Sequence, residues 1–391
     1  MPLRNLSILL ASQMISAAGS IVLVTLGGII GSQLTDKQAL ATLPVSVMVI
    51  SVAATTVPAT LLMRAIGRKH GYALASLSAA ASMLLAAYAV AAANFPLFIL
   101  AAAIFGINMA FTQQYRYAAA ESVAPRQAGR AISIVLVGAI GGAFVGSELV
   151  NAGHSWIGDF PYAGTLVAVA VLYAVQSLLF LLLGPLRGED REASMESHRP
   201  LGQIIRQPVF IVAVLGGTVA YGVMTLIMTA TPLSMHIHDG YSLGDTSNVI
   251  RAHVLGMYVP SLVSVLLIDR LGTVRLMAAG AVALLVASLV GLQGRSIMHY
   301  WYALVLLGVG WNFLYVGGTT MLTLTYSMAE RFKAQAVNEF SVFGTSATAS
   351  LLAGTVIHLY GWHTLVLVPI PLLLMIALGL FIVRRDPLVR A

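Results

Sequence analysis

The sequence predicts an all-α membrane protein with twelve transmembrane helices in two six-helix halves. Its 391 residues are 59% hydrophobic and only 9% charged, whereas a soluble domain carries about 25% charged residues. The apolar residues stand in long runs, which favours helices because a transmembrane strand would alternate apolar and polar residues. The longest charged segment separates six of these runs from six more. These observations exclude a soluble protein and a barrel.

Each of the twelve runs is about long enough to cross a bilayer as a helix. They lie near 6–30, 41–63, 71–93, 96–120, 131–152, 162–185, 208–233, 247–268, 275–293, 299–325, 338–359 and 363–384. We therefore predict an N-terminal six-helix half over 1–185, a cytoplasmic linker over 186–206 and a C-terminal six-helix half over 207–391. The first run is too long for a signal peptide and no cleavage site follows it, so we expect it to stay in the mature chain.

The basic residues predict the orientation of these spans. With the N-terminus inside, every Lys and Arg falls in an inner loop except Lys37, Arg251, Arg295 and the intramembrane Arg116. This bias follows the positive-inside rule. We expect a multi-pass protein of the bacterial inner membrane with both termini in the cytoplasm.

Composition and motifs exclude several kinds of chemistry. The chain has no cysteine, which rules out disulfides, iron–sulfur clusters and thiolate metal sites. Its net charge of +7 is dispersed over short loops, so we predict no nucleic-acid partner. No nucleophile–base pair or phosphate-binding loop is present, so we predict that the protein is not an enzyme and holds no prosthetic group. We expect a monomer whose partners are the lipid bilayer and a transported solute.

Methionine and histidine recur at helical spacing in the seventh and eighth spans. Met224 and Met228 lie four residues apart, as do His253 and Met257, so each pair shares one face of its helix. The spans are antiparallel neighbours, and Met228 and His253 lie at similar depth below the loop that joins them. Thioether and imidazole ligands suit Cu(I) better than a hard cation. Methionine that merely fills gaps between helices is the alternative.

A second group lies where the seventh span meets the outer surface. Met235, His236 and His238 could form a collecting vestibule that passes copper to the four deeper ligands. Histidine must be neutral to bind a metal, so copper binding should weaken at acidic pH. Copper is then a transported substrate and not a cofactor.

A competing polar set suits a different solute. Gln113 and Arg116 share a face of the fourth span, and Trp311 and Asn312 lie in the tenth. A charge in lipid costs about 2.5–3.5 kcal/mol at the bilayer centre, so Arg116 should face a cavity or a partner, or extend to the interface. Aromatic, amide and guanidinium groups together would suit a planar organic molecule such as a flavin.

Equivalent inner loops of the two halves are similar in sequence. Residues 64–69 read RAIGRK and residues 269–272 read DRLG. These loops resemble the signature loop of the major facilitator superfamily, and the resemblance covers essentially the whole chain. It implies a carrier that works by alternating access, with two halves rocking about a site near the midplane.

These loops also provide candidate coupling and gating residues. Arg64 stands where the family has an acid, so Glu121 is a candidate partner for Arg64 or Arg68. Glu148, near the outer end of the fifth span, is the candidate site for a coupling proton. The full set is Arg64, Arg68, Glu121, Glu148, Asp269 and Arg270. Basic residues that only orient the chain are the alternative.

The fifth span carries Gly129, Gly138, Gly142 and Gly146. This pattern is similar to the antiporter motif of the same superfamily, but Ala143 replaces its proline. Glycines at helix contacts are common in membrane bundles. Proton-coupled export and simple helix packing therefore both remain open.

The methionine and histidine pairs, with the segments 253–261, 310–313 and 317–319, resemble the CcoA-like transporter branch of the superfamily. Members import copper for cytochrome c oxidase assembly or, in a sister group, carry riboflavin. By that likeness Met224, Met228, His253 and Met257 would be the copper ligands. Our first expectation is uptake of copper, as Cu(I), from periplasm to cytoplasm. The alternative is a carrier of a small organic molecule, either riboflavin or an exported drug.

Overall fold

A computed structural model describes residues 2–123, 128–186, 199–327 and 330–390. The structure is 86% helical, and its described part contains no strand. Among these described residues, ten helical segments are long and apolar enough to cross a membrane, and one of them, Lys333–Val383, contains two consecutive helices. The prediction of an all-α membrane protein is confirmed.

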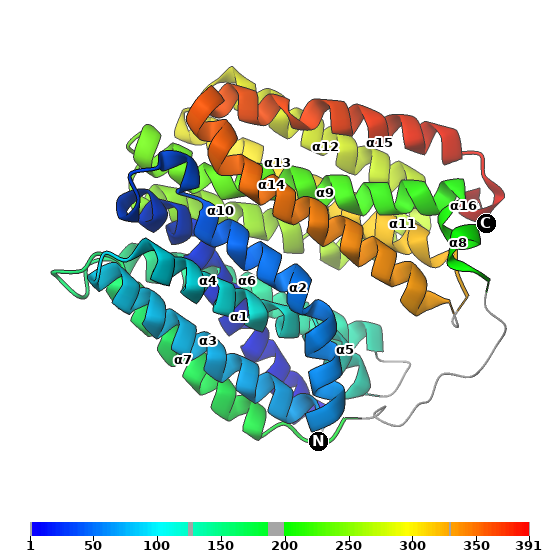
Figure 1. The fold of residues 1–391 in the computed structure, drawn as a ribbon. Coiled ribbons are helices and arrows are strands. Elements are labelled where there is room, and N and C mark those ends of the chain that lie inside the picture. The colour runs from blue at the N-terminus through cyan, green and yellow to red at the C-terminus, as the bar shows by residue number, and fades with distance from the viewer. Residues whose placement is uncertain (1, 124–127, 187–198, 328–329, 391) are drawn as a thin grey trace. The chain divides into compact units, whose positions relative to one another are not determined.

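The first half of the chain forms long helices joined by short turns (Figure 1). These are α1 (Pro2–Leu34), the short η1 (Gln38–Leu40), α2 (Leu43–Ile66), α3 (Arg68–Ala91), α4 (Phe95–Thr112), α5 (Tyr115–Glu121), α6 (Ala128–Gly153) and α7 (Ala163–Leu181). The span expected over 96–120 is divided, because a turn at Gln113 and Gln114 separates α4 from α5.

The second half has more interruptions than its hydropathy indicates. Its elements are α8 (Leu201–Ile205), α9 (Pro208–Pro232), the π-helix η3 (Leu233–His238), α10 (Leu243–Tyr258), α11 (Ser261–Leu271), α12 (Thr273–Gln293), α13 (Ile297–Thr323), α14 (Arg331–Leu367), α15 (Pro369–Val383) and α16 (Pro387–Arg390). The span expected over 247–268 breaks at Pro260, which has no N–H and disfavours helix in the preceding residue. Gly361 interrupts α14 with a φ of +75°, a conformation that suits glycine.

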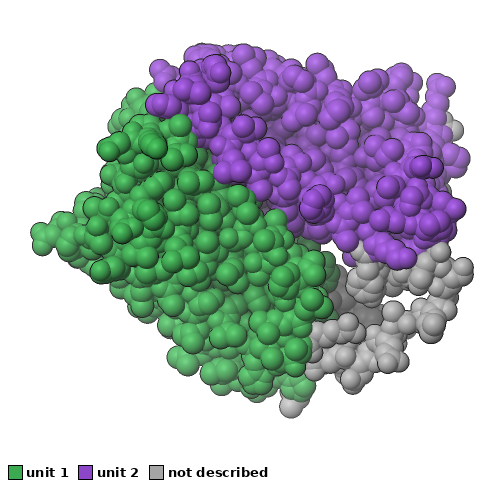
Figure 2. Space-filling model, in the orientation of Figure 1, with its two compact units in different colours: residues 1–190, 229–251 green, residues 191–228, 252–391 purple. Residues whose placement is uncertain are grey.

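The helices group into two compact units, coloured separately in Figure 2. Unit 1 contains residues 1–190 and 229–251, and unit 2 contains residues 191–228 and 252–391. The division passes through α9 after Met228 and through α10 after Arg251. The end of α9, the π-helix and the start of α10 therefore belong to the same unit as α1–α7.

Unit 1 is organised around close packing of α1 on α6. A Cβ atom added at Gly138, Gly142 or Gly146 would meet the backbone carbonyls of α1. Small residues allow helix backbones to approach closely in a membrane, where packing replaces the hydrophobic effect as the force between helices. In this structure the glycine row formed by Gly138, Gly142 and Gly146 is therefore a packing surface for α1, and Gly129 lies outside the residues whose surroundings are described.

Unit 2 is organised around α13. Gly308 lies against the backbone of α10 at His253 and Met257, and Gly310 lies against the backbone of α12 at Gly280. Because both contacts involve backbone, α13 is held on two sides with little freedom to rotate. This fixed rotation decides which of its side chains face other helices.

Candidate functional site

Four aromatic side chains of unit 2 form a cluster that we call the aromatic box. They are Tyr221 of α9, Trp311 and Tyr315 of α13, and Phe343 of α14. The ring centroids of Trp311 and Tyr315 lie 5.2 Å apart with an interplanar angle of 19°. Tyr221 meets Trp311, Tyr315 and Phe343 edge-on, at 5.2, 5.0 and 5.9 Å. Aromatic pairs prefer these stacked and edge-to-face arrangements.

The box lies near the midpoints of its helices. Trp311 and Tyr315 are four residues apart near the middle of α13, so they share one face. Tyr221 is near the middle of α9, and Phe343 lies in α14 before its break at Gly361. In the carriers that the sequence resembles, substrate sites lie near the midplane of the membrane.

Trp311 has an unpaired polar atom inside this apolar surrounding. Its side chain is only 6% exposed, and its indole N–H has no hydrogen-bond partner among the described residues. A buried donor without a partner costs about 1–3 kcal/mol, and most such groups in native proteins have a reason. The box therefore combines aromatic faces with one available donor, a combination suited to a planar aromatic ligand with an acceptor atom.

Asn312, the neighbour of Trp311 in the sequence, has a different role. Its Nδ2 donates to the carbonyl of Met257 at 2.8 Å, and its Oδ1 accepts from the hydroxyl of Ser264 at 2.7 Å. The Met257 carbonyl lies at the break that Pro260 makes between α10 and α11. Asn312, which we expected to contact a solute, thus stabilises the interrupted helix α10–α11 instead.

Gln113 and Arg116, the two other residues of the polar set predicted to suit an organic solute, belong to unit 1. Gln113 lies in the turn between α4 and α5, where its backbone N–H bonds to the carbonyl of Met109 at 3.3 Å. Arg116 lies in the first turn of α5 and is half-buried. Its guanidinium donates a hydrogen bond to the hydroxyl of Tyr117 at 3.3 Å. The guanidinium carbon also lies 5.0 Å from the centroid of the Tyr117 ring.

The four residues expected to bind copper all belong to unit 2. Met224 is half-buried, Met228 and Met257 are each 9% exposed, and His253 is fully buried. His253 Nδ1 lies 2.8 Å from the carbonyl of Leu304 on α13. Since a carbonyl only accepts, Nδ1 carries the proton and Nε2 holds the lone pair. Nε2 is buried and has no partner in the described part of the chain.

One residue of the expected collecting vestibule is not at the surface. Met235, in the π-helix that follows α9, is fully buried. His236 Nδ1 is 2.7 Å from the carbonyl of Tyr241 and stabilises the loop before α10, and His238 is exposed. Among the residues that the structure describes, no three His, Asp or Glu side chains gather as a metal site.

Comparison with known proteins identifies the family. The family model of the Major Facilitator Superfamily matches residues 8–247 and 215–391. The chain belongs to the major facilitator superfamily. It is 38% identical to the riboflavin transporter RfnT of Brucella anthropi, over 98% of this chain and 96% of that protein. It is 28% identical to the uncharacterized MFS-type transporter YdeG of Bacillus subtilis, over 90% and 86%.

Solved structures show the same fold. The xylose transporter XylE of E. coli, in a partially occluded inward open conformation, matches with a TM-score of 0.74 at 11% identity over 99% of this chain and 98% of that one. The nucleoside transporter NupG matches with a TM-score of 0.72 at 14% identity over 98% and 99%. These structures confirm the predicted fold, and membership of the superfamily makes the protein a membrane transporter and not an enzyme.

One ion pair in unit 1 joins the superfamily loop at residues 64–69 to the end of α5. Arg68, at the start of α3, lies 2.6 Å from Glu121 at the end of α5, and it also donates to the hydroxyl of Tyr72 at 3.2 Å. Arg68 is one of the two partners that the sequence allowed for Glu121. The side chains of Arg64 and Asp269 lie outside the described residues, and Arg270 is exposed.

Glu148 lies at a polar contact between α6 and the first part of α10. Its carboxylate is 3.5 Å from Arg251, whose guanidinium lies 5.0 Å from the ring centroid of Phe144. Beside it, the hydroxyl of Ser147 donates to the carbonyl of Ser247 at 3.1 Å. The Glu148 side chain is 67% exposed, so it is not a buried carboxyl group. A role in proton coupling stays a prediction.

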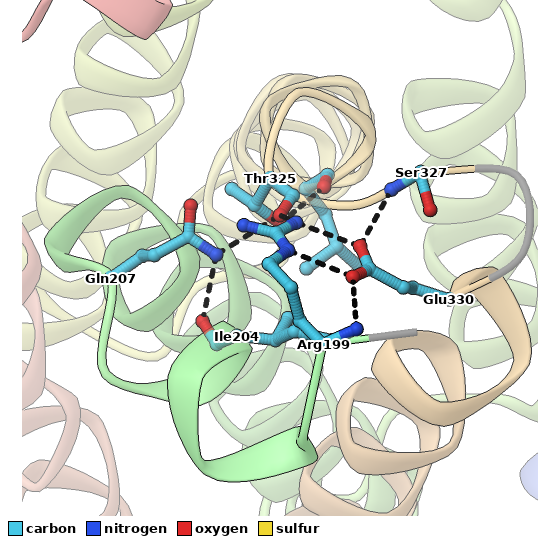
Figure 3. Close-up of polar contacts among 7 residues, drawn as sticks. Arg199, Ile204, Gln207, Thr325, Ser327 and Glu330 are labelled. Atoms are coloured by element: carbon cyan, nitrogen blue, oxygen red, sulfur yellow. Dashed lines mark hydrogen bonds and ion pairs between the residues drawn. The ribbon is translucent and has the colours of Figure 1, made fainter. Parts of the chain in front are cut away.

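One polar cluster that the sequence did not indicate lies in unit 2, outside the membrane spans (Figure 3). Glu330, just before α14, accepts from the Nε and Nη2 atoms of Arg199 at 2.8 and 2.7 Å and from the backbone N–H of Ser327 at 2.9 Å. These bonds from Arg199 and Ser327 hold the pKa of Glu330 well below its usual range, and the same pairing raises the pKa of Arg199. The residues are 131 positions apart, so no local pattern reveals the pair.

Proposed function

We propose that this major facilitator transporter carries a planar aromatic solute of the flavin type, with riboflavin as the first candidate. The observation that supports it is the stacked Trp311–Tyr315 pair, whose buried indole N–H has no partner in the described chain. The relative from Brucella anthropi that is 38% identical carries the name riboflavin transporter. Uptake into the cytoplasm of a bacterial cell, by a monomer with both termini inside, is part of the proposal.

The chemistry of the box matches that of a flavin ring. A flavin ring system is flat, carries no net charge and has carbonyl and ring-nitrogen acceptors along one edge. Stacking on an aromatic side chain contributes about 1–3 kcal/mol per base in nucleic-acid binding, a comparable planar case. The indole N–H of Trp311 supplies a donor for one acceptor, and no formal charge is needed. Binding at the midplane also allows the solute to be reached from either side in turn.

Riboflavin uptake tests the proposal directly. Labelled riboflavin would be measured in cells that cannot make it, expressing the wild type, Trp311→Phe or Trp311→Ala. The phenyl ring keeps the stack but removes the donor, so Trp311→Phe should raise KM roughly two- to tenfold. Trp311→Ala should raise it roughly five- to a hundredfold. Trp301→Phe is the matched control, because Trp301 is an exposed tryptophan on the same helix. Equal KM values for all four proteins would contradict the proposal.

Copper uptake is the second candidate, and one observation favours it. The buried Nε2 of His253 holds a lone pair with no partner among the described residues, and the other ring nitrogen bonds to a backbone carbonyl. Metal-binding histidines usually have this second bond. Radio-copper uptake by the wild type and by Met228→Leu and His253→Ala separates the two candidates. The copper assignment would replace the flavin proposal if the wild type accumulates copper, both variants lose this accumulation, and the wild type takes up no riboflavin.

A further inference from the structure

A groove on the surface of unit 2 shares no lining residue with the aromatic box. It lies between α12 and α15, has a volume of about 300 Å³ and is lined almost entirely by apolar side chains. Its lining includes three small residues, Ala278, Ala281 and Ala377. The complete lining is Val274, Ala278, Ala281, Val282, Leu285, Leu373, Leu374, Ala377, Leu380, Phe381 and Arg384.

The groove has the length and direction of a lipid chain. The two helices are antiparallel, and the lining spans twelve residues on each side of the groove, from Val274 to Leu285 and from Leu373 to Arg384. At 1.5 Å per residue, the eleven steps between the first and last of these residues are about 16 Å along the helix axes, roughly half of the hydrocarbon thickness of a bilayer. Val282, Leu374 and Phe381 are exposed, so in a membrane this face contacts lipid.

One end of the groove is charged. Arg384 directly follows α15 and is the only charged residue of the lining. Its guanidinium carbon lies 3.8 Å from the ring centroid of Phe381, which holds it at the mouth of the groove. No ion pair that the structure shows among its described residues involves Arg384. A guanidinium at this level is suited to the phosphate of a lipid headgroup.

We propose that this groove binds one anionic phospholipid, with an acyl chain between α12 and α15 and the headgroup phosphate at Arg384. The apolar walls accept any acyl chain, and the arginine selects for negative charge. Basic pockets between transmembrane helices are known to bind anionic headgroups in this way. The site is independent of the aromatic box, so it does not depend on which solute is carried.

Native mass spectrometry of the purified protein in detergent tests the proposal, with phosphatidylglycerol and phosphatidylcholine as probes. The wild type should bind one phosphatidylglycerol at about fivefold lower lipid concentration than phosphatidylcholine, which is the contribution of one arginine near an anionic surface. Arg384→Gln should remove this preference. Arg385→Gln, the same change one residue further and outside the lining, should retain it.

Two further measurements separate the acyl chain from the headgroup. Ala281→Leu with Ala377→Leu fills the hollow, so it should weaken binding of both lipids while the melting temperature without lipid stays unchanged or rises. Glycerol 3-phosphate, which has the headgroup phosphate but no chain, should not compete. Equal binding of the two lipids by the wild type, equal effects of Arg384→Gln and Arg385→Gln, or undiminished binding after the groove is filled would each overturn the proposal.

Discussion

Arg199 and Glu330 form a two-point ion pair across 131 residues of sequence, with distances of 2.8 and 2.7 Å between their nitrogen and oxygen atoms. The Glu330 side chain is only 3% exposed, although that of Arg199 is 45% exposed. Paired guanidinium–carboxylate bonds of this geometry are the strong form of a charged hydrogen bond. The carbonyl of Thr325 accepts from both Arg199 and Gln207 at 3.0 Å, so the pair ties the segment before α9 to the loop before α14.

This pair predicts a defined pH dependence of stability. Because the pKa of Glu330 is lower in the folded protein than its unfolded value of about 4.3, its stabilisation is complete above about pH 5 and is lost as the pH falls further. The difference in melting temperature between wild type and Glu330→Gln should therefore be constant from pH 8 to pH 5 and shrink below pH 4. A difference that grows on acidification would contradict this assignment.

The packing of α6 on α1 predicts a contrast between two glycines. A Cβ atom at Gly142 would meet the backbone of α1, whereas one at Gly344 would meet nothing within 4 Å. Gly142→Ala should destabilise the protein by about 1–3 kcal/mol, as overpacking does. Gly344→Ala should be neutral or stabilise by up to about 1 kcal/mol, because alanine favours helix. Melting temperatures in detergent would measure both, and equal effects would show that the glycine row is not a packing surface.

Trp311 and Asn312 are adjacent but have different roles, so their substitution should affect different properties, the KM for riboflavin and the stability of the protein. Asn312→Ala removes the bonds to the Met257 carbonyl and the Ser264 hydroxyl, so it should lower stability by about 1–3 kcal/mol. It should leave the KM for riboflavin unchanged in the protein that remains folded. Trp311→Phe should do the opposite, with altered KM and little change in melting temperature. A large KM effect of Asn312→Ala would show that the amide contacts the solute.

The absence of cysteine makes the predicted orientation simple to test. Lys37 lies in the loop between α1 and α2, and Leu201 lies at the start of α8; both are exposed. In intact cells a membrane-impermeant maleimide should label Lys37→Cys and leave Leu201→Cys unlabelled. Permeabilised cells should show labelling of both. The reverse pattern would place both termini outside.

The sequence predicted the helices and the family well, and the polar contacts less well. Apolar runs located the spans to within a few residues, but the breaks at Gln113 and Pro260 lie inside runs that hydropathy alone reads as continuous. The sequence singled out Trp311 as a candidate substrate-binding residue, but it did not indicate Tyr221 and Phe343, the members of the aromatic box on other helices. They come from α9 and α14, and no spacing within one helix relates them to α13.

Hydropathy by itself determined that this chain crosses a membrane many times as helices. The bilayer interior is uniformly apolar, so whether a segment spans it as a helix depends on the length and composition of that segment alone. The tertiary structure decided which side chains meet. The rotation of α13, set by its glycine contacts with α10 and α12, turns Trp311 toward an aromatic cluster and Asn312 toward a broken helix. That rotation depends on residues of three helices at once, so it could not be read from any one of them.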